Sequence, residues 1–350
     1  MRNKGRIKAI FCVLLSVVFC AFGVLCVKHR ASQCLNFKES VSFLSALSVM
    51  PDASLNEQTK SQKPSKKKIK ATTSETTPKQ EIEDNSNHEG EKTYKIQEIN
   101  ISSGEFSYND FSVTNNTSYD MNVEKLLNSE LGFDFKDTRQ AQVLIVHTHT
   151  CESYMDSDED FYFESFYPRT VNNEKNVTAV GEEIAKSLKS NGIGVVHAKT
   201  QHDYPSYDGA YDRSYDTIMS YLEKYKEIKV VLDIHRDSMT SDDMTKLKPT
   251  FTYNGEKAAQ IMIMSGYGVN DSSFPFWEDN LKFALKLQDT CENMYSGMTR
   301  PLNFGEYTYN MNANCGSLLI EVGTDANSLE QAKRTGKMLG NALAQVLQNS

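Results

Sequence analysis

The sequence predicts an α/β fold with a mostly parallel central sheet flanked by helices over residues 141–350. Two features predict it. Short, continuous apolar runs, typical of strands buried on both faces, alternate with longer segments of helical periodicity. Each run stops abruptly at polar residues, as a central strand does where it leaves the core. The alternation favours parallel pairing, because each helix carries the chain back to the start of the next strand.

The first strand and helix of this domain show both patterns. Residues 141–146 (AQVLIV) are a continuous apolar run. The helix is expected over 176–192, and Gly192 stands where a glycine commonly ends a helix. Four apolar residues of that segment share one helical face: Val177, Val180, Ile184 and Leu188.

The remaining segments continue the alternation. Asn254 and Gly255 predict a hairpin within 250–268, followed by another strand. A domain extension is expected over 95–140, with a strand near 94–102 and a short helix within 121–133. The other expected elements are strands at 192–198, 228–234 and 317–323, and helices at 214–227, 277–295 and 328–348.

The N-terminal part of the chain differs from this domain. Ala9 to Val27 is a run of nineteen residues without a charge, which is just long enough to span a membrane as a helix. Four basic residues within 1–8 predict a cytoplasmic N-terminus and an outward-facing body. A cleaved signal peptide is the alternative, although the run exceeds the usual apolar region of such peptides. Residues 28–94 are expected to be a juxtamembrane and disordered linker, because they contain few large apolar residues.

Charge and cysteine content exclude several classes of protein. Residues 1–95 carry 16 basic and 9 acidic side chains, and the remainder carries 22 and 37. An acidic body repels phosphate, which argues against nucleic acid as a partner. The seven cysteines form no CxxC pair and no regular framework, so a disulfide scaffold and a zinc ribbon are both excluded. Any metal in the body is therefore expected to bind histidine and carboxylate ligands.

Histidine and glutamate follow three of the predicted strands. His147 and His149 follow 141–146, His235 follows 228–234, and Glu321 lies in 317–323. Ligands of open α/β sheets bind beyond the carboxyl ends of the strands. Two imidazoles and carboxylates that converge there are ligands typical of zinc, with a coordination position left open for water.

Four sequence segments together resemble the stage II sporulation protein P family of spore-forming Firmicutes: HTHTCESY, NNEKNVTAVG, VVLDIHRDS and LLIEVGTDANSLEQA. That family is similar to the zinc-dependent N-acetylmuramoyl-L-alanine amidases. The resemblance covers about 95–350. It implies a zinc amidase-like catalytic domain over 141–350, with Zn2+ as cofactor.

The resemblance also implies roles for individual residues. By the amidase pattern, Glu174 is the second metal ligand, His235 the third and Glu321 the catalytic carboxylate. The first ligand is His149, whose spacing from the strand suits the pattern, with His147 as the alternate. In an extended segment these two rings point the same way and could both reach the site, and His147 is otherwise expected to support the ligands.

Other residues remain open as ligands or substrate contacts. Glu152 is the alternate to Glu174, since it lies in the same strand-end segment as His149. Arg236 and Asp237 are expected to orient the ligands or to bind a carboxylate of a stem peptide. Tyr204, Tyr207 and Tyr211 belong to a tyrosine-rich insertion that either lines the cleft or packs as a surface loop.

The function expected from this resemblance is hydrolysis of peptidoglycan during sporulation engulfment. The bond is the N-acetylmuramoyl-L-alanine amide, and cleavage of stem-peptide cross-links is left open. The implied partners are sporulation proteins D and M in the same membrane. The implied location is the cell membrane, with a single span and an extracytoplasmic catalytic domain between mother cell and forespore. The alternatives are a non-catalytic wall-binding scaffold and a zinc carboxypeptidase that acts on stem peptides.

Overall fold

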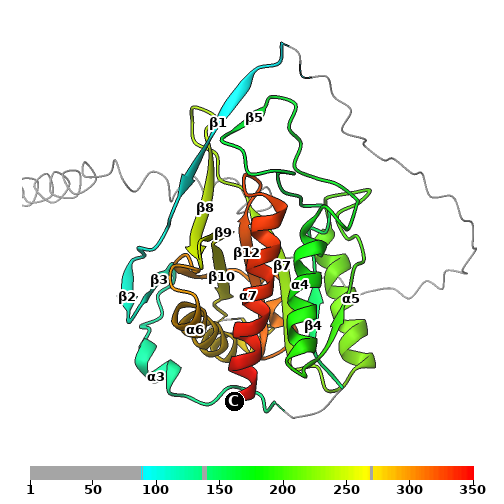
Figure 1. Cartoon of the computed structure of the whole chain (residues 1–350). Helices are drawn as coiled ribbons and strands as arrows, with labels where there is room; N and C mark the ends of the chain where they lie inside the picture. Colours follow the sequence, from blue (N-terminus) through cyan, green and yellow to red (C-terminus); the bar gives the residue numbers. More distant parts are fainter. Residues whose placement is uncertain (1–87, 89, 136–139, 269–270) are drawn as a thin grey trace, which may run out of the picture. The chain divides into compact units, whose positions relative to one another are not determined.

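The computed structural model describes residues 88, 90–135, 140–268 and 271–350 (Figure 1). They belong to the second of two compact units, 61–350. The predicted anchor, 9–27, and nearly all of the predicted linker, 28–94, lie outside the described residues. Within the described part of the chain, no helix combines the length and the apolar character needed to cross a membrane.

Most of the expected elements are present at the expected places. The helices are α3 (Val123–Leu127), α4 (Val177–Ser190), α5 (Ala210–Lys224), α6 (Trp277–Met294), η2 (Met311–Ala313) and α7 (Leu329–Gln348). The strands are β1 (Thr93–Ile99), β2 (Phe106–Tyr108), β3 (Phe111–Asn115), β4 (Ala141–Val146), β5 (Phe161–Phe163), β6 (Gly194–His197), β7 (Val230–Asp237), β8 (Lys246–Tyr253), β9 (Glu256–Ala259), β10 (Ile261–Gly266), β11 (Leu302–Gly305) and β12 (Ser317–Thr324).

An eight-stranded sheet with the order β2-β3-β11-β10-β12-β7-β4-β6 forms the centre of the domain. Four neighbouring strands, β12, β7, β4 and β6, are parallel to one another. Strand β10, however, runs antiparallel to β12, and β2 runs antiparallel to β3. A second sheet, β5-β1-β8-β9, has one parallel and two antiparallel pairings. Both sheets are mixed, so the prediction of a mostly parallel sheet is wrong.

A hairpin precedes β10 in the chain. Strands β8 and β9 are antiparallel and meet at Asn254 and Gly255, whose φ angles of 52° and 82° are left-handed. This hairpin is confirmed as predicted. Between β7 and β10 the chain passes through this hairpin and contains no crossover helix of the kind that parallel neighbours require, and β10 is antiparallel to β12.

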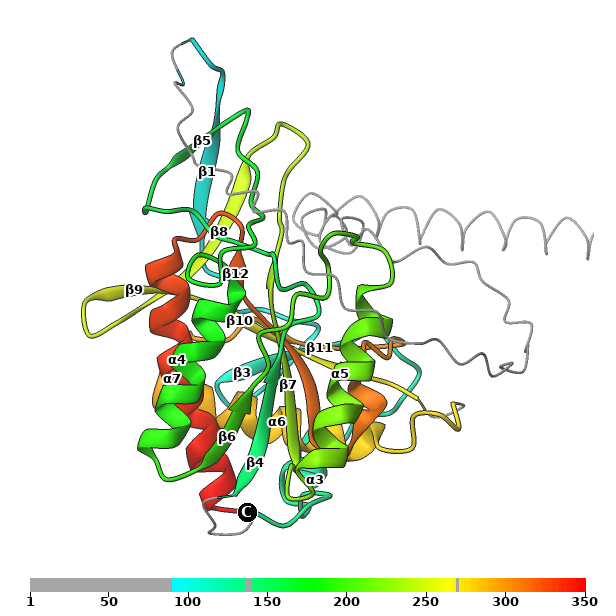
Figure 2. The same ribbon diagram turned by 90° about the vertical axis from the view of Figure 1, so that its right-hand side faces the viewer.

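Helices cover both faces of the parallel strands. Val143 and Ile145 of β4 pack into a core cluster shared with α4, α6 and α7, while Leu144 and Val146 pack with Ile218 of α5. Figure 2 shows α4 and α7 on one side of β6, β4 and β7, and α5 on the other side. Burial on both faces is the physical reason for the continuous apolar runs.

Candidate metal-binding and catalytic site

The ends of three neighbouring strands deliver the predicted site residues to one edge of the sheet. Strand β7 lies between β4 and β12. Glu321 of β12 stands directly beside His235 of β7, and Val146 of β4 stands beside Asp233. The segment that follows β4 therefore begins next to His235. The prediction that these strand ends meet is confirmed.

Two imidazoles and two carboxylates form a buried cluster at this edge. The rings of His149 and His235 are perpendicular, with centroids 5.2 Å apart. His235 Nδ1 lies 3.5 Å from Glu152 Oε2, and His235 Nε2 lies 2.9 Å from Asp233 Oδ1. The second contact is of ion-pair length, but His235 Nε2 makes no hydrogen bond. The backbone N–H of Arg236 donates to Glu152 Oε2 at 3.2 Å.

The charges of this cluster shift several pKa values. Burial alone would lower the pKa of His235, but Asp233 and Glu152 outweigh it and hold that pKa well above its usual range. Burial would raise the pKa of Glu152, and His235 and Arg236 reverse the shift, so this carboxyl stays ionised. The proton on His235 thus balances two negative neighbours. Burial lowers the pKa of His149, which keeps that ring neutral.

Glu321 is buried beside the cluster. Burial raises the pKa of its carboxyl, and the negative charge of Asp237 raises it further against the opposing effect of His235. Its Oε2 atom is buried and makes no hydrogen bond. A carboxyl whose pKa is raised in this way suits proton transfer near neutral pH.

His147 points away from the cluster. Its Nδ1 is 2.9 Å from the carbonyl oxygen of Ile234, and its Nε2 is 2.8 Å from Nε2 of His197. Residues 148–151 form a turn, so the alternation of an extended segment does not apply and the two rings diverge. Of the two histidines, the structure brings only His149, the favoured one, to the cluster. Both ring nitrogens of His147 already have partners.

Glu152 lies in the cluster, and Glu174 does not. Glu174 is exposed, in a turn before α4 whose N-cap is Asn176. Glu152 is buried and pairs through its backbone with Arg169, while its carbonyl accepts from the N–H of Val177. The ligand role implied for Glu174 by the resemblance therefore has no support in this geometry, whereas the alternate carboxylate, Glu152, lies beside His235.

Arg236 and Asp237 orient neighbouring segments. The buried Arg236 guanidinium donates from Nε to the carbonyl of Ser153 at 3.0 Å and from Nη2 to that of Pro168 at 2.7 Å. Asp237 accepts from Nη1 of Arg300 at 2.8 Å. Two roles were expected for Arg236. Its contacts fit the first, which is to orient the segment that carries Glu152, because its guanidinium already donates to two carbonyl groups.

The tyrosine-rich insertion packs onto the cluster. Tyr207 stacks on His149 with centroids 4.6 Å apart, and Tyr211 lies 6.5 Å from His235, also stacked. Tyr204, in contrast, is 41% exposed. Sequence reasoning missed Asp233 and the contact of Tyr207 with His149. The signal for Asp233 was present, since it is an acidic residue inside an apolar strand.

The donor types fit zinc, although the side chains are not arranged as a formed site. Among the residues described, no group of three or more His, Cys, Asp or Glu side chains converges closely enough to hold a metal ion. Yet the 3.5 Å between His235 Nδ1 and Glu152 Oε2 matches the ligand spacing of roughly 3.3–3.5 Å that zinc bonds of about 2.0–2.2 Å imply. His149 Nδ1 and Glu321 Oε2 are buried without a hydrogen-bond partner. The site therefore offers zinc-type donor atoms, of which His149 Nδ1 and Glu321 Oε2 are not used in hydrogen bonds.

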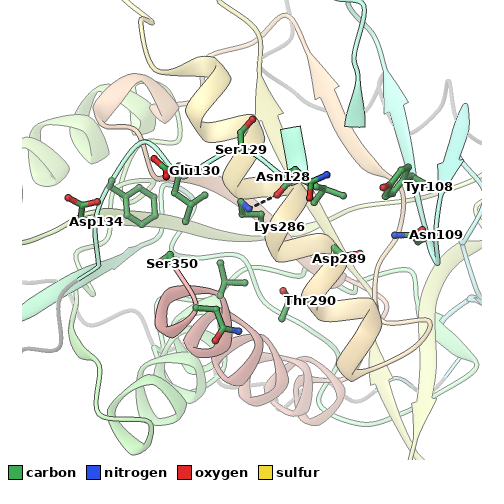
Figure 3. Close-up of a pocket in the computed structure, with 15 residues that line it drawn as sticks. Tyr108, Asn109, Asn128, Ser129, Glu130, Asp134, Lys286, Asp289, Thr290 and Ser350 are labelled. Carbon is green, nitrogen blue, oxygen red and sulfur yellow. Dashed lines mark hydrogen bonds between the residues drawn. The ribbon is translucent and has the colours of Figure 1, made fainter. Parts of the chain in front are cut away.

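A separate pocket of about 720 Å³ lies away from these residues (Figure 3). Its lining includes Glu130, Asp134, Lys286 and Asp289, and the Lys286 ammonium donates to the carbonyl of Leu127. None of the cluster residues lines it. It is therefore distinct from the candidate site.

Comparisons with known proteins agree with the sequence resemblance. The family model described as stage II sporulation protein P matches residues 33–344. The stage II sporulation protein P of Bacillus subtilis (strain 168) is 27% identical over 222 residues, which cover 58% of this chain and 50% of that protein. The chain thus spans about half the length of this curated relative.

Several solved structures are similar over part of the chain. An N-acetylmuramoyl-L-alanine amidase from Clostridium difficile 630 is 15% identical, with a TM-score of 0.34, over 61% of this chain and 97% of its own. The N-acetylmuramoyl-L-alanine amidase AmiC2 of Nostoc punctiforme is 10% identical, with a TM-score of 0.34, over 59% of this chain and 95% of its own. Scores this low do not establish a common fold.

Proposed function

Since the chain belongs to the stage II sporulation protein P family, we propose that it is a sporulation peptidoglycan hydrolase, and specifically a zinc-dependent N-acetylmuramoyl-L-alanine amidase. One observation carries the proposal. Two imidazoles, His149 and His235, lie with Glu152 at the same sheet edge as Glu321, all buried, with partnerless atoms on His149 and Glu321.

The proposed zinc ligands are His149, Glu152 and His235. Glu152 replaces Glu174 in this set because it is the carboxylate beside His235. A zinc ion bound there would supply Lewis-acid chemistry, polarising the scissile carbonyl and acidifying a water molecule. The ionised Glu152 and neutral His149 are the ligand states that such an ion requires, and His235 would have to release the extra proton that Asp233 and Glu152 hold on it.

Glu321 is the proposed proton carrier. As the water oxygen bonds to the carbonyl carbon, Glu321 Oε2 accepts the proton that the water loses. The C–N bond then breaks, and the same carboxyl returns the proton to the leaving amine. Its raised pKa places it near the range where both transfers are efficient. Burial of the carboxyl restricts solvent access to that proton.

The proposed substrate and setting rest on the family resemblance. The proposed bond joins the lactyl group of muramic acid to L-alanine, and a cross-link amide of the stem peptide is a second substrate for the same chemistry. We place the chain at the cell membrane, anchored by Ala9 to Val27, with its catalytic domain outside the cytoplasm during engulfment. Sporulation proteins D and M are the proposed partners.

The test is digestion of purified peptidoglycan by the full-length chain, followed by mass spectrometry of the products. We expect muropeptides split between muramic acid and L-alanine, loss of activity with a chelator, and its return with zinc. Glu321→Gln should lower kcat by about 10²–10⁴-fold while zinc content is unchanged. The matched control is Glu330→Gln, because Glu330 is exposed on α7.

Other products identify the alternatives. Binding to peptidoglycan without any cleavage would indicate a scaffold. Release of carboxyl-terminal residues from free stem peptides would indicate a carboxypeptidase. Cleavage that survives exhaustive removal of zinc would end the metal part of the proposal.

A further inference from the structure

We propose that the segment between β11 and β12 binds the sugar part of the substrate, through a column of tyrosine rings that begins at the candidate site. Tyr309 is the contact residue, and Asn310 is the residue that positions it. This inference rests on the proposed function, because the sugar is that of the muramic acid next to the scissile amide. It needs no metal ion, and it concerns a segment to which the proposed function gives no role.

Three tyrosines form a continuous aromatic column that ends at His235. Tyr211, in the first turn of α5, is stacked with His235, with 6.5 Å between ring centroids and 13° between ring planes. Tyr309 stacks on Tyr211 at 5.3 Å and 28°, and Tyr307 stacks on Tyr309 at 5.0 Å and 29°. Tyr211 and Tyr309 are only partly buried. The column thus joins the segment after β11 to the cluster and keeps one side accessible.

The backbone that carries Tyr309 is held in an unfavourable conformation. Tyr309 and Asn310 have φ angles of 39° and 59°, so two successive residues with side chains adopt the left-handed region. Asparagine tolerates this region, but a bulky tyrosine rarely adopts it. Such backbone persists only where surrounding contacts enforce it, and it is concentrated at binding and catalytic sites. The strain therefore favours a functional role for the ring of Tyr309.

The Asn310 side chain supplies contacts that enforce this conformation. Its Nδ2 donates to the carbonyl oxygen of Tyr211 at 3.0 Å and to Oγ of Ser214 at 2.8 Å. Ser214 Oγ in turn lies 2.7 Å from Oγ1 of Thr148, in the turn after β4. Asn310 therefore ties its own segment to α5 and, through Ser214, to the turn beside the cluster. The ring of Tyr309 is fixed relative to the candidate site by these bonds.

The charges around the column favour a neutral ligand. Exposed carboxylates flank it in the sequence, with Asp208 and Asp212 near the first turn of α5 and Glu306 just after β11. The guanidinium of Arg213, in the same part of α5, donates to three carbonyl oxygens of the tyrosine-rich insertion. This surface repels the carboxylates of a stem peptide. A sugar ring is uncharged, and its C–H and hydroxyl groups suit the apolar body and polar tip of tyrosine.

The connectivity of the proposed substrate also brings a sugar to this side of the site. Only an ether oxygen and the lactyl carbon separate the ring of muramic acid from the scissile carbonyl carbon. An amide held beside Glu321 and His235 therefore has its sugar among the nearest neighbours of those side chains. Tyr211 is one of them, and Tyr309 continues the aromatic surface away from the cluster. The sugar lies against the accessible side of the column, because the ring faces within it contact one another.

The experiment compares two soluble probes that differ only in the sugar. N-acetylmuramoyl-L-alanyl-D-isoglutamine and D-lactyl-L-alanyl-D-isoglutamine are titrated calorimetrically into the full-length chain carrying Glu321→Gln, which prevents turnover. We expect tighter binding of the first probe. Adding Tyr309→Ala should weaken that probe alone, by about 2–10-fold. Adding Asn310→Gly should also weaken it alone, because glycine accepts the left-handed backbone but removes the bonds that fix the ring.

A matched control and the product analysis separate the outcomes. Tyr225→Ala removes a stacked tyrosine at the other end of α5 and should leave both affinities unchanged. Equal or absent binding of both probes to the parent protein would overturn the inference. So would an equal loss for both probes in Tyr309→Ala with a native circular dichroism spectrum, and Asn310→Gly decides if that spectrum is not native.

Cleavage of peptidoglycan by the wild type is scored separately from probe binding. Cleavage together with equal probe affinities would leave the hydrolase intact and reject the sugar-binding column. A preference for the sugar-bearing probe that depends on Tyr309, without any cleavage, would support the column and overturn the proposed enzyme.

Discussion

At the scale of residues, burial distinguishes the carboxylates of this chain. An ionised carboxylate leaves water only when partners compensate for the lost hydration. Glu152 has them in His235 and the backbone N–H of Arg236. Glu174 remains exposed at the end of a turn. Only the first lies beside His235, at the position of the proposed zinc ligands.

This contrast makes a direct prediction. Glu152→Gln should reduce zinc affinity and hydrolysis by about 10²-fold or more, because a neutral amide is a poorer ligand than a carboxylate. Glu174→Gln should leave both unchanged. Zinc content by atomic absorption and release of labelled peptidoglycan measure the two effects. The reverse pattern would restore Glu174 as the ligand.

At the scale of elements, helix α4 approaches the sheet closely at one glycine. A Cβ on Gly181 would lie 2.7 Å from Nε2 of both His147 and His197. The two imidazoles are buried, and they contact each other in the space that the missing side chain leaves. Gly181 therefore allows the helix to pack against a pair of histidines that support the strand end.

The prediction at this scale concerns Gly181→Ala. In an exposed helix this change would stabilise by about 1 kcal/mol. Here the added methyl group collides with two fixed rings, so a net loss of about 1–3 kcal/mol is expected. Urea unfolding followed by circular dichroism measures it, with Lys186→Ala on the exposed face as the control. A stabilised variant would show that the histidine pair moves freely.

At the scale of the whole domain, contacts between distant segments hold the site together. Asp237 at the end of β7 pairs with Arg300, just before β11, and both are buried. Glu321 stands between these charges and the histidines, and both charges act on its pKa. The ion pair thus joins the parallel strands to the β10 and β11 part of the sheet.

Removal of one partner of this pair should destabilise the entire domain. Arg300→Met leaves the Asp237 carboxylate buried and unpaired, with an expected loss of about 3–5 kcal/mol. Arg334→Met breaks a more exposed pair with Glu256 at 3.3 Å, where a change below about 1 kcal/mol is expected. The urea concentrations at the unfolding midpoints of the two variants measure these losses of stability. Equal midpoints would mean that Asp237 finds another partner.

The sequence determined the local features of this protein. Apolar runs specified the strands that meet at the site, the asparagine–glycine pair specified the hairpin, and the residues at the strand ends identified His149, His235 and Glu321. These features depend on burial and backbone preference, which short patterns record. Strands β2, β3, β5 and β11 are short or mostly polar, and the pattern did not reveal them.

The tertiary structure alone decided which side chains share the site. Thr148 bonds to Asp233, 85 positions away, and Arg236 holds Ser153, 83 positions away. These bonds bend the chain into a turn after β4, which separates His147 from His149 and brings Glu152 to His235. Sequence spacing could not show this, because the energy of that turn comes from contacts that exist only once β4 and β7 are paired.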